Sequence, residues 1–129
     1  MDTPLPESVE QVATAVVDAA YAVHKALGPG LLESAYEACL SYELRKRGLA
    51  VRSQVVMPIV YDGVTLAEGF RADMVVCDCV LVELKCVDAV LPVHEAQVLT
   101  YLRLSGLPIG FLINFHAPLL KLGIKRFRA

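Results

Sequence analysis

Apolar residues near the N-terminus recur at steps of three and four, which is the spacing of one face of an α-helix. They are Val9, Val12, Ala13, Val16, Ala20, Val23 and Leu27. We therefore predict an amphipathic helix over residues 8–27, with Ser8 as its N-cap, ended by the Gly-Pro-Gly segment 28–30. A second helix is predicted over about residues 31–47, because its basic end complements the helix dipole and Gly48 suits a C-cap.

The middle of the chain has the branched apolar residues and turn residues that are typical of β-strands. We predict a strand over residues 51–60, a hairpin turn at Asp62-Gly63 and a second strand over residues 64–76. This second strand is expected to bulge or break near Gly69. A third strand is predicted over residues 80–86.

The C-terminal part of the chain combines one more helix with apolar strands. Pro92 suits the first turn of a helix over about residues 93–105, and Gly106 ends that helix. Residues 109–114 are typical of a buried strand, and residues 119–127 are a candidate for another. The order helix, helix, three strands, helix, and one or two strands predicts a mixed sheet of four to five strands flanked by helices, in the α/β (α+β) class.

The composition narrows the kinds of protein that fit this pattern. A chain of 129 residues has the size of one domain, so we expect a single domain over 1–129. No apolar run reaches the ~20 residues of a membrane-spanning helix, and the acidic, proline-containing start lacks the pattern of a signal peptide, which predicts a cytoplasmic protein without a membrane partner. The net charge of −2 argues against non-specific coating of nucleic acid, although it allows a local basic patch. The four cysteines lie in apolar segments, which favours free buried thiols over a zinc site.

One stretch, residues 73–85 (DMVVCDCVLVELK), places acids and a lysine on two adjacent strands. If its turn is the three residues 77–79, Asp73 lies directly opposite Glu83, and Lys85 shares the face of Glu83. Two like charges roughly 5 Å apart repel by about 3 kcal/mol, so a shared proton, Lys85 or a divalent cation must offset them. A turn of even length would instead put the two carboxylates on opposite faces, and the spacing alone leaves both arrangements open.

A larger set of residues resembles a known family. The segment Gly30–Tyr36 (GLLESAY) resembles the motif of the GxxExxY proteins, a group of small bacterial proteins. The resemblance covers roughly residues 10–127 through an ordered series of segments: His24–Gly30, the strand with Asp73, Val82–Lys85, His94–Gln97 with Tyr101, and Gly110–Phe115.

A broader resemblance concerns the two acids and the lysine. An Asp followed about ten residues later by Glu-x-Lys on an adjacent strand resembles the signature of the PD-(D/E)XK nuclease superfamily, with which the GxxExxY proteins are grouped. Ala72 stands where the name of the signature has proline. The resemblance implies a restriction-endonuclease-like core in α-β-β-β-α-β order, which agrees with the order predicted above from the pattern.

The resemblance also implies a metal site and a reaction. Asp73 and Glu83, helped by the Leu84 carbonyl, would hold Mg²⁺ or Mn²⁺, and the metal would activate a water and neutralise charge on a phosphate. Glu33 would be a further carboxylate facing the metal, although an acid in the first turn of a helix is also favoured by the dipole alone. Lys85 would orient the water or stabilise the transition state, and its alternative role is a salt bridge to one of the acids.

Further residues have weaker functional interpretations. By resemblance, Gln97 on the third helix would orient Lys85 or the water, and Tyr101 on the same polar stripe is a candidate substrate contact. Such a stripe is also typical of the solvent-facing side of a helix. Tyr36 either steadies Glu33, stacks against substrate or is a core aromatic. Four basic side chains near the C-terminus predict one phosphate-contacting patch: Lys121, Lys125, Arg126 and Arg128.

Two functions therefore remain open. The first is a metal-dependent nuclease acting on DNA or RNA, which is favoured because the two acids and Lys85 are present in a matching order. The second is a non-catalytic binding or scaffold protein, including a homodimer, that keeps the nuclease fold. The acidic net charge and the small size favour the second, because no separate element for reading nucleic acid is visible.

Overall fold

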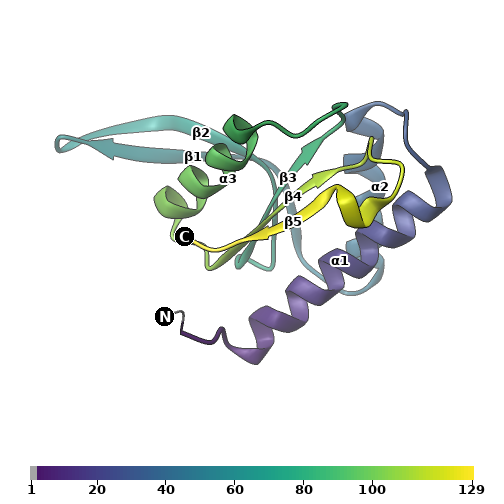
Figure 1. Cartoon of the computed structure of the whole chain (residues 1–129). Helices are drawn as coiled ribbons and strands as arrows, with labels where there is room; N and C mark the ends of the chain where they lie inside the picture. The colour runs from purple at the N-terminus through teal and green to yellow at the C-terminus, as the bar shows by residue number, and fades with distance from the viewer. Residues whose placement is uncertain (1–2) are drawn as a thin grey trace.

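The structure is a computed structural model that describes residues 3–129 (Figure 1). Within these residues it contains three α-helices, a short 3₁₀ helix and five strands. In chain order they are α1 (Glu7–Leu27), α2 (Glu33–Lys46), β1 (Val51–Tyr61), β2 (Val64–Val76), β3 (Val80–Lys85), α3 (Pro92–Ser105), β4 (Ile109–Asn114), η1 (Leu120–Leu122) and β5 (Ile124–Phe127). The predicted α+β class and element order are confirmed. No helix in residues 3–129 is long and apolar enough to cross a membrane.

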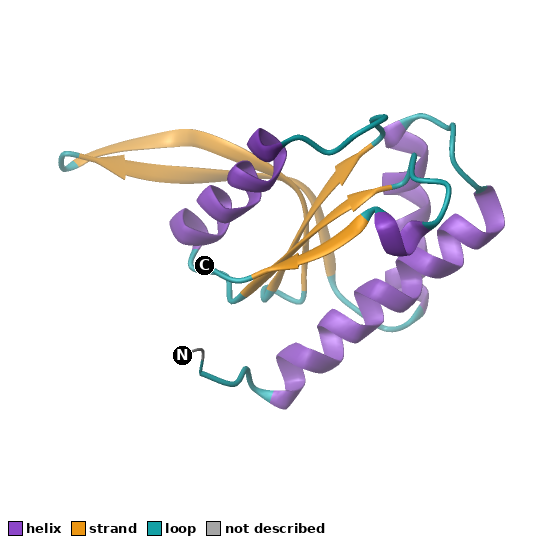
Figure 2. Ribbon diagram, in the orientation of Figure 1, coloured by secondary structure: helices purple, strands orange, loops and turns teal. Residues whose placement is uncertain are grey.

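The five strands form one mixed sheet in the order β1-β2-β3-β4-β5. Neighbouring strands are antiparallel except β3 and β4, which are parallel and are connected through α3. Helices α1 and α2 cover one face of the sheet and α3 covers the other (Figure 2). Each face has its own core: Leu40 and Phe115 belong to the cluster beneath α1 and α2, and Val98 and Leu112 to the cluster beneath α3. The polar site described below lies between these layers.

Two predicted helix caps are wrong. Helix α1 begins at Glu7 and its N-cap is Pro6, whose carbonyl accepts the N–H groups of residues 9 and 10, so Ser8 lies inside the first turn. Helix α2 ends one residue earlier than a Gly48 cap requires, because Arg47 is the C-cap. Gly48 follows with a φ of 84°, in the left-handed region that favours glycine.

The predicted strand over residues 119–127 is shorter in the structure. Its first half forms the 3₁₀ turn η1, and only Ile124–Phe127 pairs with β4. A Cβ at Gly123 would lie 2.5 Å from the Asn114 carbonyl oxygen, so the chain approaches β4 closely at that glycine before it enters β5.

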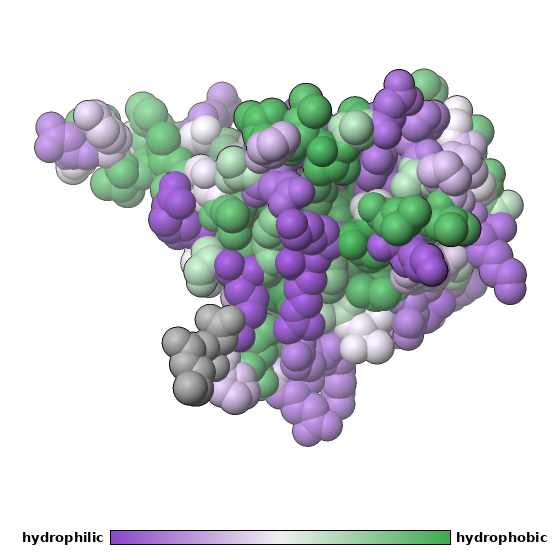
Figure 3. Space-filling model, in the orientation of Figure 1, coloured by the Kyte–Doolittle hydropathy of each residue, from purple (hydrophilic) through white to green (hydrophobic). Residues whose placement is uncertain are grey.

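The hairpin of β1 and β2 projects beyond the rest of the sheet (Figure 1). Its tip is the predicted Asp62-Gly63 turn, with φ values of 50° and 76°. The register shifts between Met57 and Ile59, opposite Gly69, where a Cβ would lie 2.4 Å from Ile59 Cγ2. The expected irregularity is therefore a bulge, and β2 continues through it. Hydrophobic side chains are exposed along this projecting hairpin (Figure 3).

Candidate active site

The turn between β2 and β3 decides how the two acids are placed. Val76 pairs with Val80, so the turn is the odd-length segment 77–79. Two further residue pairs follow in the same register. The next residues in line are Asp73 and Glu83, which lie just beyond the last pair of the ladder and are joined by a hydrogen bond from the Asp73 N–H to the Glu83 carboxylate. Of the two arrangements that the spacing allowed, the structure has the one with opposed carboxylates.

The alternation of side chains between the two faces of the sheet is interrupted in β2 at Asp73. Ala72 and Met74 are two residues apart and would share a face in a regular strand, but they pack in the two different core clusters. Opposite Asp73 in β1 lies Gln54, which has a φ of 53° and falls between two paired residues of the ladder. The pairing of β2 with β3 also ends at Met74. The two strands consequently separate at Asp73, and backbone groups there lose their ladder partners.

The carboxylates take the place of those missing partners. The Asp73 N–H donates to Glu83 Oε1 at 3.0 Å, and the Leu84 N–H donates to Asp73 Oδ2 at 2.9 Å. Each acid is thus fixed by the opposite strand. The N–H and C=O of one strand residue point to the same edge, so the Leu84 carbonyl also faces the Asp73 side. Carboxylate and backbone carbonyl oxygens are the kind of donor that Mg²⁺ and Mn²⁺ prefer.

Glu83 is buried, with only 3% of its surface exposed. Burial first and the charge of Asp73 second raise the pKa of its carboxyl to about 8, while the hydrogen bond from the Asp73 N–H and the charge of Lys85 oppose the rise. At neutral pH without metal, this carboxyl therefore holds its proton. A proton is one of the three ways predicted above to offset the repulsion. A divalent cation between the acids would favour its release, so the donor set fits such an ion.

Lys85 is held from the side of α3. Its Nζ donates to Gln97 Oε1 at 3.4 Å, and Gln97 Nε2 donates to the Tyr101 hydroxyl at 3.0 Å. The Tyr101 ring stacks on Phe70 of β2, with ring centroids 4.4 Å apart. In residues 3–129 Lys85 forms no salt bridge, so the salt-bridge alternative is not what the structure contains. The expected contact between Gln97 and Lys85 is present, and its catalytic role stays a prediction.

Glu33, the first residue of α2, lies near enough to Asp73 and Lys85 for their charges to act on it. Partial burial raises its pKa, the charge of Asp73 adds to the rise, and Lys85 opposes it. However, no group of three or more His, Cys, Asp or Glu side chains within residues 3–129 is placed to hold a metal. If two carboxylates and a carbonyl held an Mg²⁺ ion, the other positions around it would be left to water. Direct coordination by Glu33 stays a prediction. The four cysteines are free and half-buried.

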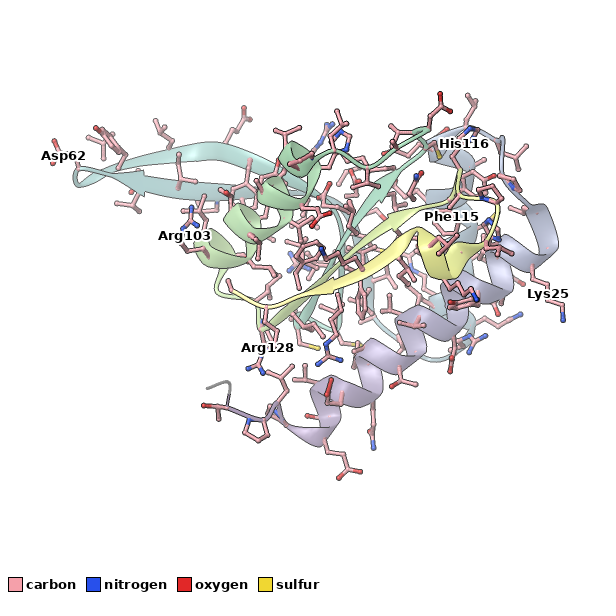
Figure 4. All side chains as sticks on the ribbon, viewed as in Figure 1. Lys25, Asp62, Arg103, Phe115, His116 and Arg128 are labelled. Atoms are coloured by element: carbon pink, nitrogen blue, oxygen red, sulfur yellow. The ribbon has the colours of Figure 1, made fainter. Side chains whose placement is uncertain are left out.

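Tyr36 has a structural role. It is completely buried, and its hydroxyl donates to the Gly28 carbonyl and accepts the Leu31 N–H at 3.1 Å. Its ring stacks on Phe115 with centroids 4.6 Å apart and an angle of 2° (Phe115 is labelled in Figure 4). The alternatives of substrate stacking and of steadying Glu33 are wrong, because the hydroxyl is engaged by the loop between α1 and α2 and the ring is in the core.

The predicted C-terminal basic patch is not formed. Lys125 Nζ lies 2.6 Å from Glu95 on α3, whereas an Arg126 guanidinium nitrogen lies 2.7 Å from Glu10 on α1. Because α3 and α1 lie on opposite faces of the sheet, these adjacent residues point in opposite directions. A single surface made of Lys121, Lys125, Arg126 and Arg128 is therefore wrong. Contact of the individual side chains with a substrate stays a prediction.

Three residues near the site were not identified from the sequence. Gln54 Nε2 donates to Glu37 Oε1 at 2.6 Å, which joins β1 to α2. Burial raises the pKa of Glu37, and the Gln54 hydrogen bond and the charge of Arg71 oppose this rise. Arg71 is exposed and forms no salt bridge in the described part of the chain. In the sequence, only its position two residues before Asp73 could have indicated that Arg71 lies near the site.

Comparison with known proteins gives one match to a family model. The family model of the PD-(D/E)XK nuclease superfamily matches residues 10–127, which is nearly the whole chain. A search of curated proteins and a search of solved structures gave no match. The matched range includes all the elements that form the carboxylate pair and hold Lys85.

Proposed function

The chain belongs to the PD-(D/E)XK nuclease superfamily, and from this premise we propose that it is a metal-dependent nuclease that hydrolyses phosphodiester bonds at Asp73, Glu83 and Lys85. The observation that supports this most is the separation of β2 and β3, where each carboxylate accepts a backbone N–H of the opposite strand. We also place the chain in the narrower GxxExxY family, on the segment Gly30–Tyr36.

Asp73, Glu83 and the Leu84 carbonyl would hold Mg²⁺ or Mn²⁺, with Glu33 as a further acid beside them. When bound, the ion supplies a water of lowered pKa and neutralises charge that grows on the phosphate. The burial of Glu83 keeps bulk water from competing for its oxygens. The backbone hydrogen bonds fix both carboxylates before an ion arrives, so little ordering is left for the binding step.

Lys85 would provide the positive charge that stabilises the phosphate in the transition state. Gln97 and Tyr101 are positioning residues in this proposal, since they act through Lys85. The hydrogen bond from Lys85 to Gln97 uses one of the three ammonium N–H groups, which leaves two for a water or a phosphate oxygen.

The direct test is cleavage of labelled nucleic acid. We expect the protein to cut at least one of single-stranded DNA, double-stranded DNA and RNA with Mg²⁺ or Mn²⁺, and EDTA to abolish the reaction. If no substrate is cut with either ion, the proposal fails and the non-catalytic scaffold becomes the better interpretation.

Metal binding has a readout that does not depend on activity. An ion at about 100 times its Kd adds roughly 2.7 kcal/mol to the free energy of unfolding, so Mg²⁺ or Mn²⁺ should raise the melting temperature. Asp73→Asn should abolish this rise, because it removes a charged ligand. Without metal the variant should be as stable as wild type or more stable, since the asparagine oxygen can still accept the Leu84 N–H while the negative charge that disfavours ionisation of Glu83 is gone.

The control is Asp62→Asn at the tip of the projecting hairpin, far from the site (Figure 4). Asparagine tolerates the positive φ of this turn position, so the fold should be unchanged. This variant should keep the wild-type response to metal. An unchanged metal response in Asp73→Asn would show that the ion binds elsewhere.

A further inference from the structure

A surface cavity of about 400 Å³ lies at the base of the β1–β2 hairpin and is lined by Val56, Glu68, Phe70 and Arg71. Its volume is within the range of about 300–1,000 Å³ that small-molecule sites occupy. Val56 and Arg71 are cross-strand partners, so they lie side by side on one face. Glu68 belongs to the bulged segment of β2, where the register shift adds residues opposite Met57 to Ile59.

The cavity is connected to the candidate active site. Arg71 is two residues before Asp73 on the same strand. The Phe70 ring rests on Tyr101, which is joined through Gln97 to Lys85. A molecule in this cavity would therefore lie next to the groups that would hold the metal and the phosphate, and would continue from them along β2.

The lining residues differ in chemistry in a way that suits one class of ligand. Arg71 offers a planar guanidinium, which binds phosphate oxygens in pairs, and in the described residues no carboxylate forms a salt bridge with it. Val56, which is 52% exposed and lies on the face of Arg71, offers an apolar surface against which a base can pack. Glu68 offers an acceptor for the N–H groups of a base edge.

A double helix cannot use this combination. Its bases are stacked on each other, so their faces are not free to lie against Val56. An unpaired nucleotide presents its phosphate, the face of its base and the edge of its base together. The cavity has one cation, Arg71, for one phosphate, and one carboxylate, Glu68, for the edge of one base.

We propose that this cavity binds an unpaired nucleotide adjacent to the phosphate that is cut, so that the substrate is single-stranded nucleic acid or an unpaired strand end. This inference rests on the proposed nuclease function. Ring stacking of Phe70 on Tyr101, and the hydrogen bonds from Tyr101 through Gln97 to Lys85, relate the strand that lines the cavity to the reacting centre.

The test is binding of fluorescent oligonucleotides in EDTA, where no cutting occurs, measured as anisotropy over a range of salt concentrations. Single-stranded DNA, single-stranded RNA and double-stranded DNA of the same sequence are the three probes. We expect both single strands to bind more tightly than the duplex. Arg71→Ala should weaken single-strand binding about tenfold and reduce the logarithmic salt slope by about 0.7.

Two further variants separate charge from stacking. Val56→Ala should weaken single-strand binding severalfold with the wild-type salt slope, because it removes apolar surface and no charge. Lys25→Ala removes an exposed cation at the opposite end of the molecule, as Figure 4 shows, and should bind like wild type. Circular dichroism and the melting temperature would confirm that each variant is folded.

The outcomes distinguish this inference from the nuclease proposal. Tighter binding of the duplex, or an Arg71→Ala variant with wild-type affinity and slope, would overturn the nucleotide site even if the protein cuts nucleic acid. Loss of single-strand binding in Arg71→Ala and Val56→Ala would support the site even if no cleavage is found.

Discussion

Replacing Lys85 with alanine should lower the rate of metal-dependent cleavage by about 10²–10³-fold, which is typical of removing one group that stabilises the transition state. Lys85 follows Glu83 on the same face of β3, and its charge acts on both Glu83 and Glu33. For substrate affinity it is one cation among the twelve Lys and Arg residues of the chain. Its loss should therefore reduce kcat strongly and change binding by about one phosphate contact.

The measurement compares wild type with Lys85→Ala, matched for purity, on single- and double-stranded DNA and RNA with each metal. Gln97→Ala should give a smaller loss of kcat, because it leaves the ammonium in place but removes its hydrogen-bond partner on α3. Lys25→Ala is the control for the loss of an exposed positive charge. A Lys85→Ala variant that cuts as fast as wild type would show that the observed cleavage comes from another site or from a contaminant.

Most of the fold was predictable because its elements have strong local signals. The apolar spacing of α1 and the glycines that follow α1 and α3 are local features, and they place the elements within a few residues. The turn at 77–79 has no such signal. Cys77 and Asp78 both have positive φ, at 50° and 52°, although neither is glycine. The number of residues in that turn, and with it the opposition of Asp73 and Glu83, was decided by the pairing of the strands.

The site was predictable where it depends on residues along a single element. Lys85 was placed on the face of Glu83 by the alternation of its strand, whereas Gln97 was named through the resemblance to the PD-(D/E)XK superfamily. The change of face at Asp73 was not predictable, since it depends on Gln54 in another strand. Arg71 was missed for the same reason. Its proposed role depends on a cavity that residues of β1 and β2 form together.

Two errors had a different origin. Lys125 and Arg126 were counted as neighbours along the chain, although the alternation of a strand was enough to place them on opposite faces. The role of Tyr36 was left open, because the position of a residue in a helix shows which residues share its face but does not show what packs against that face. Its burial comes from Phe115, which is far away in the sequence and arrives with the end of β4.

The stability of the metal-free protein should fall as pH rises, because of Glu83. The pKa of this carboxyl is about 8 in the folded protein against an ordinary value of 4.5, so the folded state holds a proton that the unfolded state releases. The stabilisation is complete below pH 4.5 and is lost as pH rises through about 8. The shift corresponds to a difference on the order of 5 kcal/mol in the free energy of unfolding.

Urea unfolding in EDTA between about pH 4.5 and pH 9 would measure this loss, and Glu83→Gln should remove most of it. Glutamine stays neutral at every pH and its oxygen can still accept the Asp73 N–H, so the variant keeps the local structure. Glu7→Gln, an exposed residue in the first turn of α1, should retain the wild-type dependence. In Mg²⁺ the wild type should lose less stability as the pH rises, because the ion binds the ionised carboxylates. A Glu83→Gln variant with the wild-type pH dependence would mean that the loss of stability comes from other groups and that Glu83 is already ionised beside Asp73.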